Sequence, residues 1–553
     1  MNEVFDSAHA MGINEMASPA VLYGVLLVAA LAVVATILVG HPISKVASPP
    51  LPAPSWSAYL PGGLMFQFYT APHTLSDVLY AFRSTLGPSF RFRLGLRTLI
   101  VTCDPKDCSR IVGRPAEWRR PPAQDAVMNT IVPGGLFCVP RPDHAELRRK
   151  LRGVFGPAML PGFWPAFQRE MATMVERMER AHRGADGVVG HNDHGGHDGD
   201  VMGREVDLST IFGSTTYGVI FNVAFGASYD EATMERMVEA NKELLAAMIP
   251  DFIGYPVRHW KLLAPLRLRA PLIKATDTLR AHYGDLVDAR TAETPAAAAA
   301  RPADLLDVII ALGGDDREAV VSNALIFGSA GGATTAESSS WASFNIITHP
   351  GCAAAVVAEL DAVVGPPGTP LQYDHIERLT YLRACWKESL RLTPPGVFFE
   401  RVAVRDSVLH VDGRMVRAGT HVMAFNGATQ RDPALWPHAE EFDPARWLPG
   451  GSAVAAGAAA ASPGVFMPFS VGPENCAGTF LADFEGVLLL ATLFHSYTCR
   501  LAVPAAAVRS VLGWSVRPGC DDPAGPPGNL RRGIPVLLQP RKVATAVDKE
   551  ACC

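Results

Sequence analysis

The amino-acid sequence predicts a mainly α-helical protein with small β-sheets, in which one amino-terminal helix tethers a single large domain. Helical spacing of apolar residues predicts buried helices at residues 207–226 and 325–340. Residues 89–102 (SFRFRLGLRTLIVT) alternate as in a small β-hairpin. Residues 20–39 form an apolar run without any charge, and such a run is about as long as a helix that crosses a bilayer core.

The amino-terminal apolar run is interpreted as a membrane anchor. A cleaved signal peptide is the alternative, but the run is longer than the usual core of a signal peptide and no basic residue precedes it. The upstream charges are Glu3, Asp6 and Glu15, whereas Lys45 follows the run. Because basic residues favour the cytoplasmic side, the long carboxy-terminal part is expected to face the cytosol.

The anchor and its flanks divide the chain. We expect a luminal tail at residues 1–18, the anchor at 19–40, a proline-rich hinge at 41–55, the large domain at 56–541 and a carboxy-terminal tail at 542–553. The hinge contains the stiff, extended sequence PPLPAP. Length alone would suggest about three domains. The motifs described below all concern one site, however, so they favour one large domain.

Composition argues against one class of partner. The formal net charge is −5 and the chain has no block of Lys or Arg, so nucleic acid is not an expected partner. The ten cysteines are scattered, without the spacing of a metal site or of a disulfide scaffold. Such a pattern fits a reducing compartment.

The loop at residues 469–478 (FSVGPENCAG) carries the strongest candidate for chemistry. Gly472 and Gly478 allow a tight turn and the close approach of a flat ligand. Cys476 comes just before an apolar helical pattern, where backbone N–H groups favour thiolate over thiol. A thiolate in this position suits an axial bond to haem iron. A buried structural cysteine is the alternative.

The pattern Phe-x-x-Gly-x-x-x-Cys-x-Gly, followed by Ala482 and Glu485, resembles the haem-binding loop of the cytochrome P450 family. The resemblance implies a haem b cofactor with Cys476 as the proximal iron ligand and Phe469 packed beside it. Where the family has a basic residue that pairs with a haem propionate, this chain has Glu474. Because like charges repel, Glu474 is expected to point away or to pair elsewhere.

Two arginines match propionate-binding positions of the family. The basic helix that begins at His144 resembles the family's Trp-x-x-x-Arg segment, with Arg148 at the Arg position and His144 in place of Trp. Arg401 falls within the strand where the family places a second propionate-binding Arg. A solvent-exposed basic helix face is the alternative for His144 and Arg148.

Residues 325–340 resemble the family's distal helix. Glycines inside a helix cost up to about 1 kcal/mol each, so Gly331 and Gly332 indicate a ligand lying against the helix or tight helix packing. The resemblance assigns Thr334 to the hydroxyl that guides protons for oxygen activation. The preceding residue is commonly acidic in the family but is Ala333 here, and Glu337 follows Thr334 by about one turn.

A third resemblance is structural. Glu388 and Arg391 lie at i and i+3, which places both side chains on one helix face. With Arg446 they resemble the family's Glu-Arg-Arg cluster, a buried network that fixes the scaffold beneath the haem loop. The resemblance extends over roughly residues 56–541.

The function implied is a haem-thiolate monooxygenase in the endoplasmic reticulum membrane. It would take electrons from NADPH–cytochrome P450 reductase or a similar donor and oxygenate a hydrophobic small molecule such as a lipid, sterol, terpenoid or xenobiotic. Phe398, Phe399 and residues 124–132 are expected to line the pocket. Two alternatives remain: an isomerase or dehydratase of a hydroperoxide or endoperoxide, which needs no reductase, and a non-catalytic haem-binding membrane protein.

Overall fold

The computed structural model describes residues 51–54, 75–94, 97–139, 143–151, 153–183, 204–252, 269–451, 463–513, 515–521, 530 and 533–542. The expected luminal tail and anchor lie outside these residues, as do most of the hinge and nearly all of the carboxy-terminal tail. The division of the chain proposed from the sequence therefore stays a prediction.

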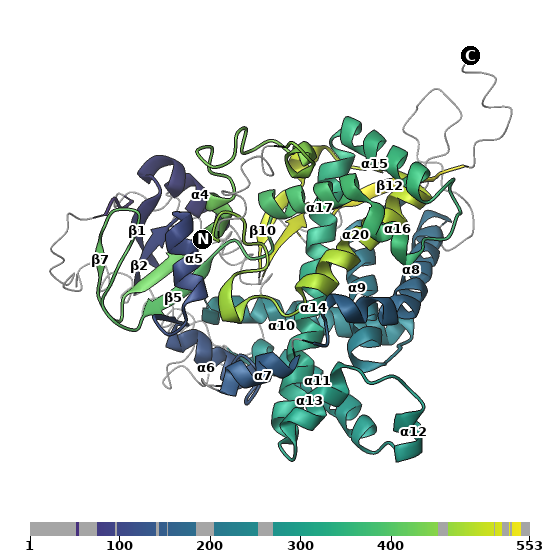
Figure 1. The fold of residues 1–553 in the computed structure, drawn as a ribbon, viewed down its shortest axis with the longest axis horizontal. Coiled ribbons are helices and arrows are strands. Elements are labelled where there is room, and N and C mark those ends of the chain that lie inside the picture. The colour runs from purple at the N-terminus through teal and green to yellow at the C-terminus, as the bar shows by residue number, and fades with distance from the viewer. Residues whose placement is uncertain are drawn as a thin grey trace, which may run out of the picture.

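Helices dominate the described part, and the longest of them, α14, runs through its centre (Figure 1). The α14 helix (Arg317–Ile347) begins where the Asp316 carboxylate accepts a hydrogen bond from the Ala319 N–H, which caps its first turn. The longer helices are α4 (Leu75–Leu86), α5 (Pro105–Gly113), α6 (Pro122–Ile131), α7 (Asp143–Leu151), α8 (Leu160–Arg183), α9 (Leu208–Phe225), α10 (Glu231–Phe252), α11 (Ala270–Thr291), α13 (Leu305–Gly313), α15 (Pro350–Val363), α17 (Thr380–Leu392) and α20 (Thr479–Ser496). Shorter helices are α12 (Pro295–Ala299), α16 (Tyr373–Arg378) and α18 (Asn426–Thr429).

The strands form small sheets beside the helices. The largest has five strands in the order β1-β2-β8-β5-β3 and lies with α4 and α5 on the left of Figure 1. In it β1 and β2 are antiparallel, with Ser89 opposite Thr102, which confirms the hairpin predicted at residues 89–102. The strands are β1 (Ser89–Leu94), β2 (Arg97–Thr102), β3 (Trp118–Arg119), β4 (Glu205–Asp207), β5 (Phe399–Ala403), β6 (Ser407–Val408), β7 (Met415–Val416), β8 (His421–Ala424), β9 (Tyr497–Leu501), β10 (Arg509–Leu512), β11 (Val516–Gly519) and β12 (Pro535–Pro540).

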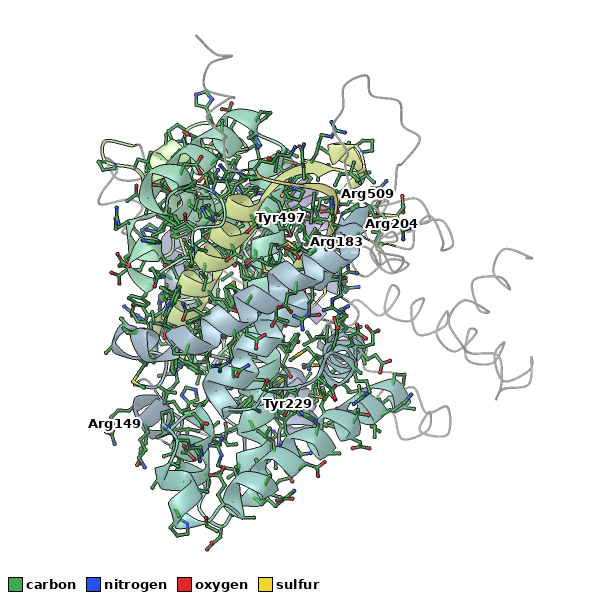
Figure 2. All side chains as sticks on the ribbon, turned by 90° about the vertical axis from the view of Figure 1, so that its right-hand side faces the viewer. Arg149, Arg183, Arg204, Tyr229, Tyr497 and Arg509 are labelled. Atoms are coloured by element: carbon green, nitrogen blue, oxygen red, sulfur yellow. The ribbon has the colours of Figure 1, made fainter. Side chains whose placement is uncertain are left out.

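The two apolar helices α9 and α20 belong to the core. In the described part of the chain they are long and apolar enough to cross a membrane, yet 72% of each apolar stretch is buried inside the protein. Both contribute to the largest hydrophobic cluster, together with α8, α14 and α17. Figure 2 shows α8 crossing the outside of this helical part, with Arg183 at its end. The prediction of a buried helix at residues 207–226 is confirmed.

The close packing of α9 on α14 depends on the two glycines of α14. A Cβ atom on Gly332 would meet the Tyr217 ring at 2.5 Å, and one on Gly331 would meet the Ile220 side chain at 2.9 Å. The Thr216 hydroxyl also donates to the Gly332 carbonyl at 2.9 Å. Helix packing therefore requires both glycines, whatever else they do.

Candidate functional site

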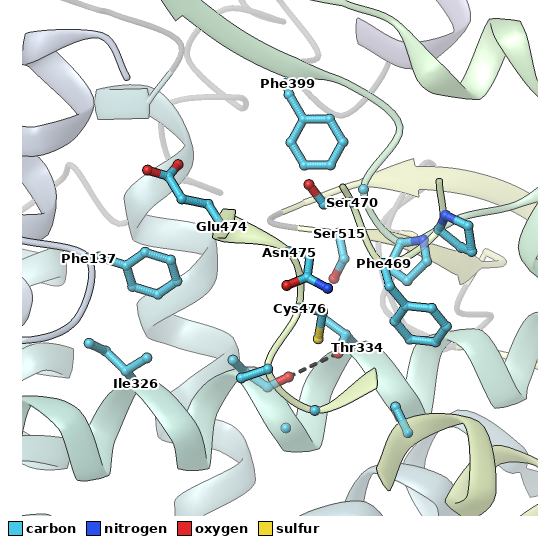
Figure 3. Close-up of a pocket in the computed structure, with 18 of the residues that line it drawn as sticks. Phe137, Ile326, Thr334, Phe399, Phe469, Ser470, Glu474, Asn475, Cys476 and Ser515 are labelled. Atoms are coloured by element: carbon cyan, nitrogen blue, oxygen red, sulfur yellow. Dashed lines mark hydrogen bonds between the residues drawn. The ribbon is translucent and has the colours of Figure 1, made fainter. Parts of the chain in front are cut away.

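A cavity of about 510 Å³ lies between α14, the loop before α20 and the strand β5 (Figure 3). Its lining is largely apolar, with a few polar groups, as in typical ligand sites. Of the predicted lining residues, Phe398 and Phe399 contribute, and the segment 124–132 contributes Gln124 and Met128. Other lining residues are Ile220, Phe327, Ala330, Gly331, Thr334, Thr335, Phe469, Cys476, Gly478, Leu481 and Ser515.

The loop at residues 469–478 holds Cys476 at the wall of this cavity. The Cys476 N–H donates to the Phe469 carbonyl at 2.9 Å, which closes the loop and places the two residues beside one another as predicted. A short 3-10 helix, Gly472–Glu474, precedes the cysteine, and α20 begins at Thr479. Local sequence thus places the sulfur at a helix start.

The two loop glycines have different reasons for being glycine. Gly472 has φ +78°, and a Cβ there would lie 2.6 Å from the Gly113 Cα of α5. Gly472 therefore permits the expected tight turn, packed on α5, and it is not among the cavity-lining residues; its role toward a ligand stays a prediction. Gly478 does line the cavity, and a Cβ there would meet nothing within 4 Å. The space beside Gly478 is therefore open to a ligand.

The Cys476 thiol faces the cavity and is solvent-accessible there, although protein surrounds the loop. Burial raises the pKa of the Cys476 thiol, whereas the Gly478 N–H, Arg148 and the Thr479 hydroxyl lower it. The expected contribution of a backbone N–H at the helix start is present, but burial outweighs it. Desolvation is the larger effect, and an additional positive charge at the sulfur is needed to offset it.

Across the cavity, α14 presents the hydroxyl side chains of Thr334, Thr335 and Ser338. Thr334 and Thr335 both line the cavity, and the Thr334 hydroxyl donates to the Ala330 carbonyl at 2.9 Å. Gly331 lines the cavity beside them, but Gly332 does not. The missing side chain of Gly332 accommodates the Tyr217 ring, so helix packing accounts for this glycine, and its role toward a ligand stays a prediction.

Basic groups gather at one side of the cavity. His144 is buried on α7 and lines the cavity with Arg148, as does Arg120. The Arg148 guanidinium donates to the Asn475 carbonyl and, at 3.0 Å, to its side-chain oxygen, so Arg148 braces the loop beside Cys476. A solvent-exposed role for this helix face does not fit residues that line a cavity.

Arg401 also lines the cavity, and it forms an ion pair with Glu474, the acid that stands where the family has a basic residue. The Arg401 guanidinium lies 3.7 Å from the Glu474 carboxylate, so Glu474 pairs elsewhere than with a propionate, as expected. Desolvation lowers the pKa of Arg401, and Glu474 opposes that effect. The Arg401 Nε atom is buried without a hydrogen-bond partner among the described residues. Such an orphaned donor is expensive unless a ligand meets it.

The Glu388–Arg391–Arg446 network is present as predicted. Arg391 donates two hydrogen bonds to the Glu388 carboxylate, at 2.8 and 2.9 Å, and Arg446 donates a third at 3.1 Å. All three side chains are almost completely buried. Both arginines also donate to backbone carbonyls, and the Trp447 indole donates to Glu388. The network lies away from the cavity lining, which fits a structural role.

Two polar cavity residues were not assigned to the cavity from the sequence: Ser515, and Glu485, which was named only as part of the haem-loop pattern. Ser515 lies in the connection between β10 and β11, and Glu485 lies on α20. Nothing near Ser515 in the sequence marks it as part of a site, because the folding of β10–β11 against α14 brings it there. Burial raises the pKa of Glu485 well above that of an ordinary carboxyl.

The residues present fit a haem. A cysteine sulfur, an unpartnered arginine donor, further basic side chains and an open space above a glycine all meet at one largely apolar cavity. These are the groups that an iron porphyrin with two carboxylates needs: a soft axial ligand, cationic partners and a flat apolar slot. The fold and the site together define a haem-thiolate protein.

Comparison with known proteins gives the family. Residues 50–506 match the sequence profile of the family described as cytochrome P450, and the chain belongs to that family. Its members bind haem b through a cysteine thiolate, and the protein is a cytochrome P450 monooxygenase. The enzyme class predicted from the sequence is thereby confirmed, against the alternative of a non-catalytic haem protein.

Similar proteins occur both in plants and in a bacterium. The chain is 29% identical to cytochrome P450 78A1 of Zea mays over 435 residues, covering 75% of each chain. It is 27% identical to cytochrome P450 734A1 of Arabidopsis thaliana, covering 79% of this chain and 80% of the relative. It is 31% identical to cyclooctatin synthase of Streptomyces melanosporofaciens, covering 76% of this chain and 85% of the relative.

Proposed function

We propose that the protein inserts one atom of O2 into a hydrophobic small molecule, using electrons from a separate reductase. The observation that carries this proposal is that the Cys476 thiol and the Thr334–Thr335 hydroxyls line one cavity from different elements. A thiolate ligand and a hydroxyl-bearing helix on the same cavity suit oxygen activation better than simple haem storage.

Specific side chains would hold the haem. Cys476 would ligate the iron, Phe469 would pack beside the loop, and Gly478 leaves space for the ring. Arg148, His144 and Arg401 would bind the propionates, and Arg401 would then satisfy its unpartnered Nε. Haem b, when bound, supplies the iron at which O2 is activated.

The chain's own groups position the reactants and exclude water. The Thr334 hydroxyl donates to Ala330 and still offers lone pairs to a proton-bearing partner in the cavity. The Gly331 position leaves the cavity wall without a side chain. The apolar lining from Ile220, Phe327 and Phe398 fits a hydrophobic substrate. This apolar lining supports the proposal of a lipid, sterol, terpenoid or xenobiotic substrate.

Ala333 supports a second candidate function, that of an isomerase or dehydratase. Ala333 stands where an acid would assist proton delivery, and a haem-thiolate isomerase or dehydratase of a hydroperoxide or endoperoxide does not need that acid. The hydroxyls of Thr334 and Thr335, both at the cavity, favour the monooxygenase.

We also propose a single-pass anchor at residues 19–40 in the endoplasmic reticulum membrane, with residues 56–541 in the cytosol and the hinge between them. The uncharged run at residues 20–39 and the proline-rich hinge support this placement. NADPH–cytochrome P450 reductase or a similar donor is the proposed partner, together with membrane lipid around the anchor.

The test is an oxygen-labelling experiment. The full-length protein in lipid vesicles, with NADPH–cytochrome P450 reductase and NADPH, is incubated under 18O2 with a panel of sterols, fatty acids and terpenoids. The proposal predicts products that carry one 18O atom and that require both NADPH and reductase. Conversion of a fatty-acid hydroperoxide at the same rate without NADPH or reductase, and no labelled product, would establish the isomerase instead.

A further inference from the structure

A second carboxylate–hydroxyl pair adjoins the cavity. Glu337 lies three residues after Thr334 on α14, so both side chains lie toward the same side of the helix. The Ser515 hydroxyl donates a hydrogen bond to the Glu337 carboxylate. Ser515 itself lines the cavity, as does Thr334 (Figure 3). The pair therefore connects the cavity wall to an acid on the oxygen-facing helix.

The surrounding structure fixes Ser515 in this position. The Ser515 carbonyl accepts from the Gly513 N–H at 2.9 Å, which tightens the connection between β10 and β11. The next residue, Val516, donates to the Pro395 carbonyl at 2.9 Å and accepts from the Trp341 indole of α14 at 3.1 Å. The Ser515 side chain is thus tied on both sides, and is only 3% exposed.

The charge environment makes Glu337 unusual. Burial raises the pKa of Glu337 to about 7, although the Ser515 hydrogen bond and Arg517 lower it. The titratable groups that face it are Arg517 on β11 and Tyr217 on α9. Glu337 as a whole residue is half-buried. Near neutral pH the carboxyl can therefore both release and regain a proton.

The residue that precedes Thr334 contributes nothing of this kind. Ala333 has no titratable group, so α14 has no acid directly before the cavity threonine. Glu337 is the acid on α14 that is hydrogen-bonded to a residue of the cavity lining, among the contacts of the described chain. The geometry places it one helical turn farther along, with Ser515 bridging the gap.

We propose that Glu337 is the proton-holding acid of this enzyme and that Ser515 passes its proton into the cavity. This rests on the monooxygenase function proposed above. In the transfer the Glu337 O–H donates to the Ser515 oxygen while the Ser515 O–H donates into the cavity. One proton leaves the carboxyl, one enters the cavity, and the Glu337 carboxylate regains a proton from water. Glu337 is thus a positioning residue, acting through Ser515.

The first test reads the acid itself. Infrared difference spectra of the full-length holoprotein are recorded between pH 5 and pH 9. We expect a protonated-carboxyl band that disappears with a midpoint near the pKa of about 7 and is absent in Glu337→Gln. Glu318→Gln, which changes an exposed acid at the far end of α14, should retain the band. The proposal would be overturned if the wild-type protein showed no such band, or if Glu337→Gln showed the same band as the wild type.

Stability gives an independent reading of the same proton. Because the folded pKa of Glu337 lies above the unfolded value of 4.5, its contribution to stability is full below about pH 4.5 and is lost as pH rises to about 7. Glu337→Gln should remove this loss, so its Tm relative to wild type should rise across that range. A pH-independent difference would contradict the proposal.

The second test separates proton transfer from packing. With NADPH, O2 and reductase, the ratio of hydrogen peroxide formed to NADPH consumed should rise in Glu337→Gln and in Ser515→Ala. Ser515→Thr keeps the hydroxyl and should retain the wild-type ratio, and Ala333→Asp should restore the ratio in Glu337→Gln. Equal ratios in Ser515→Ala and Ser515→Thr would overturn the proposal.

The two proposals fail in different ways. If the protein were an isomerase, the infrared band and the Tm dependence would persist, while the peroxide ratio would not respond to Glu337→Gln. If Glu337 held no exchangeable proton, the band and the Tm dependence would be missing while labelled oxygen still entered the product.

Discussion

The scaffold beneath the cysteine loop and the cavity wall at β5 both depend on arginines, yet they are built differently. In the scaffold, Glu388 receives three arginine hydrogen bonds, and both arginines also donate to backbone carbonyls. At the wall, the Arg401 Nε has no hydrogen-bond partner within the described part of the chain, and the guanidinium lies 3.7 Å from the Glu474 carboxylate. A satisfied network holds a fold, whereas an unsatisfied donor in a cavity is reserved for a ligand.

The largest expected effect concerns the scaffold. Glu388→Gln removes the charge that compensates two buried guanidiniums, so we expect a loss of about 3–5 kcal/mol of unfolding free energy. Thermal and denaturant unfolding of the full-length protein measure it. Asp288→Asn breaks the exposed Arg317–Asp288 pair and should leave the unfolding midpoint unchanged, because such pairs are screened by solvent. Equal effects of the two substitutions would remove the distinction between buried and exposed pairs.

Substitutions at the cavity wall should change haem affinity, and two of them should change it in opposite directions. Arg401→Leu removes a propionate partner, whereas Glu474→Gln removes the competitor of the propionate for Arg401. A hydrogen bond to a charged group contributes about 1.5–3 kcal/mol. We therefore expect haem loss to excess apomyoglobin to be about 10- to 100-fold faster in Arg401→Leu and slower in Glu474→Gln.

The control for the wall lies two residues beyond β5. Arg405→Leu breaks an exposed ion pair with Glu117 at 3.3 Å and should leave haem loss unchanged. If Arg401→Leu and Glu474→Gln both accelerated haem loss, the pair would be a structural ion pair like those of the scaffold. The comparison between the two regions would then fail.

The smallest expected effects are those of alanine substitutions at Gly332 and Gly478, which should change stability and haem content respectively. Gly332→Ala forces a methyl group into the Tyr217 ring, which should lower stability by about 1–3 kcal/mol, as overpacking does. Gly478→Ala meets no protein atom within 4 Å, so it should leave the unfolding of the haem-free protein unchanged and lower the haem content instead. Thermal unfolding and haem-to-protein ratios measure both. The reverse pattern would exchange the assigned roles.

The sequence was enough to predict features with a strong local pattern or a clear family resemblance. The hairpin at residues 89–102, the helix at 207–226 and the buried Glu388–Arg391–Arg446 network all follow from spacing and family resemblance. The resemblance also placed Phe469 beside Cys476. The hairpin, the helix and the Glu388–Arg391 pair depend on residues close in sequence, whereas Arg446, 58 residues from Glu388, was assigned by family resemblance.

Features that depend on contacts between distant parts of the chain could not be predicted from the sequence. Gly332 is explained by Tyr217, more than a hundred residues earlier, and Gly472 by Gly113 of α5. Helix geometry predicted a favoured thiolate at Cys476, but the net effect of burial appears only once the cavity is folded. Ser515 carries no local signal at all, because β10 and β11 deliver it to α14. Such contacts are set by tertiary structure.

The central claim is that Cys476 is the thiolate ligand of haem iron in this cavity. The most direct measurement is the carbon monoxide difference spectrum of the dithionite-reduced protein, recorded beside Cys476→Ser. The account predicts a thiolate-type shift of the Soret band in the wild-type protein that is lost in the variant. A histidine-type spectrum that the substitution leaves unchanged would contradict it.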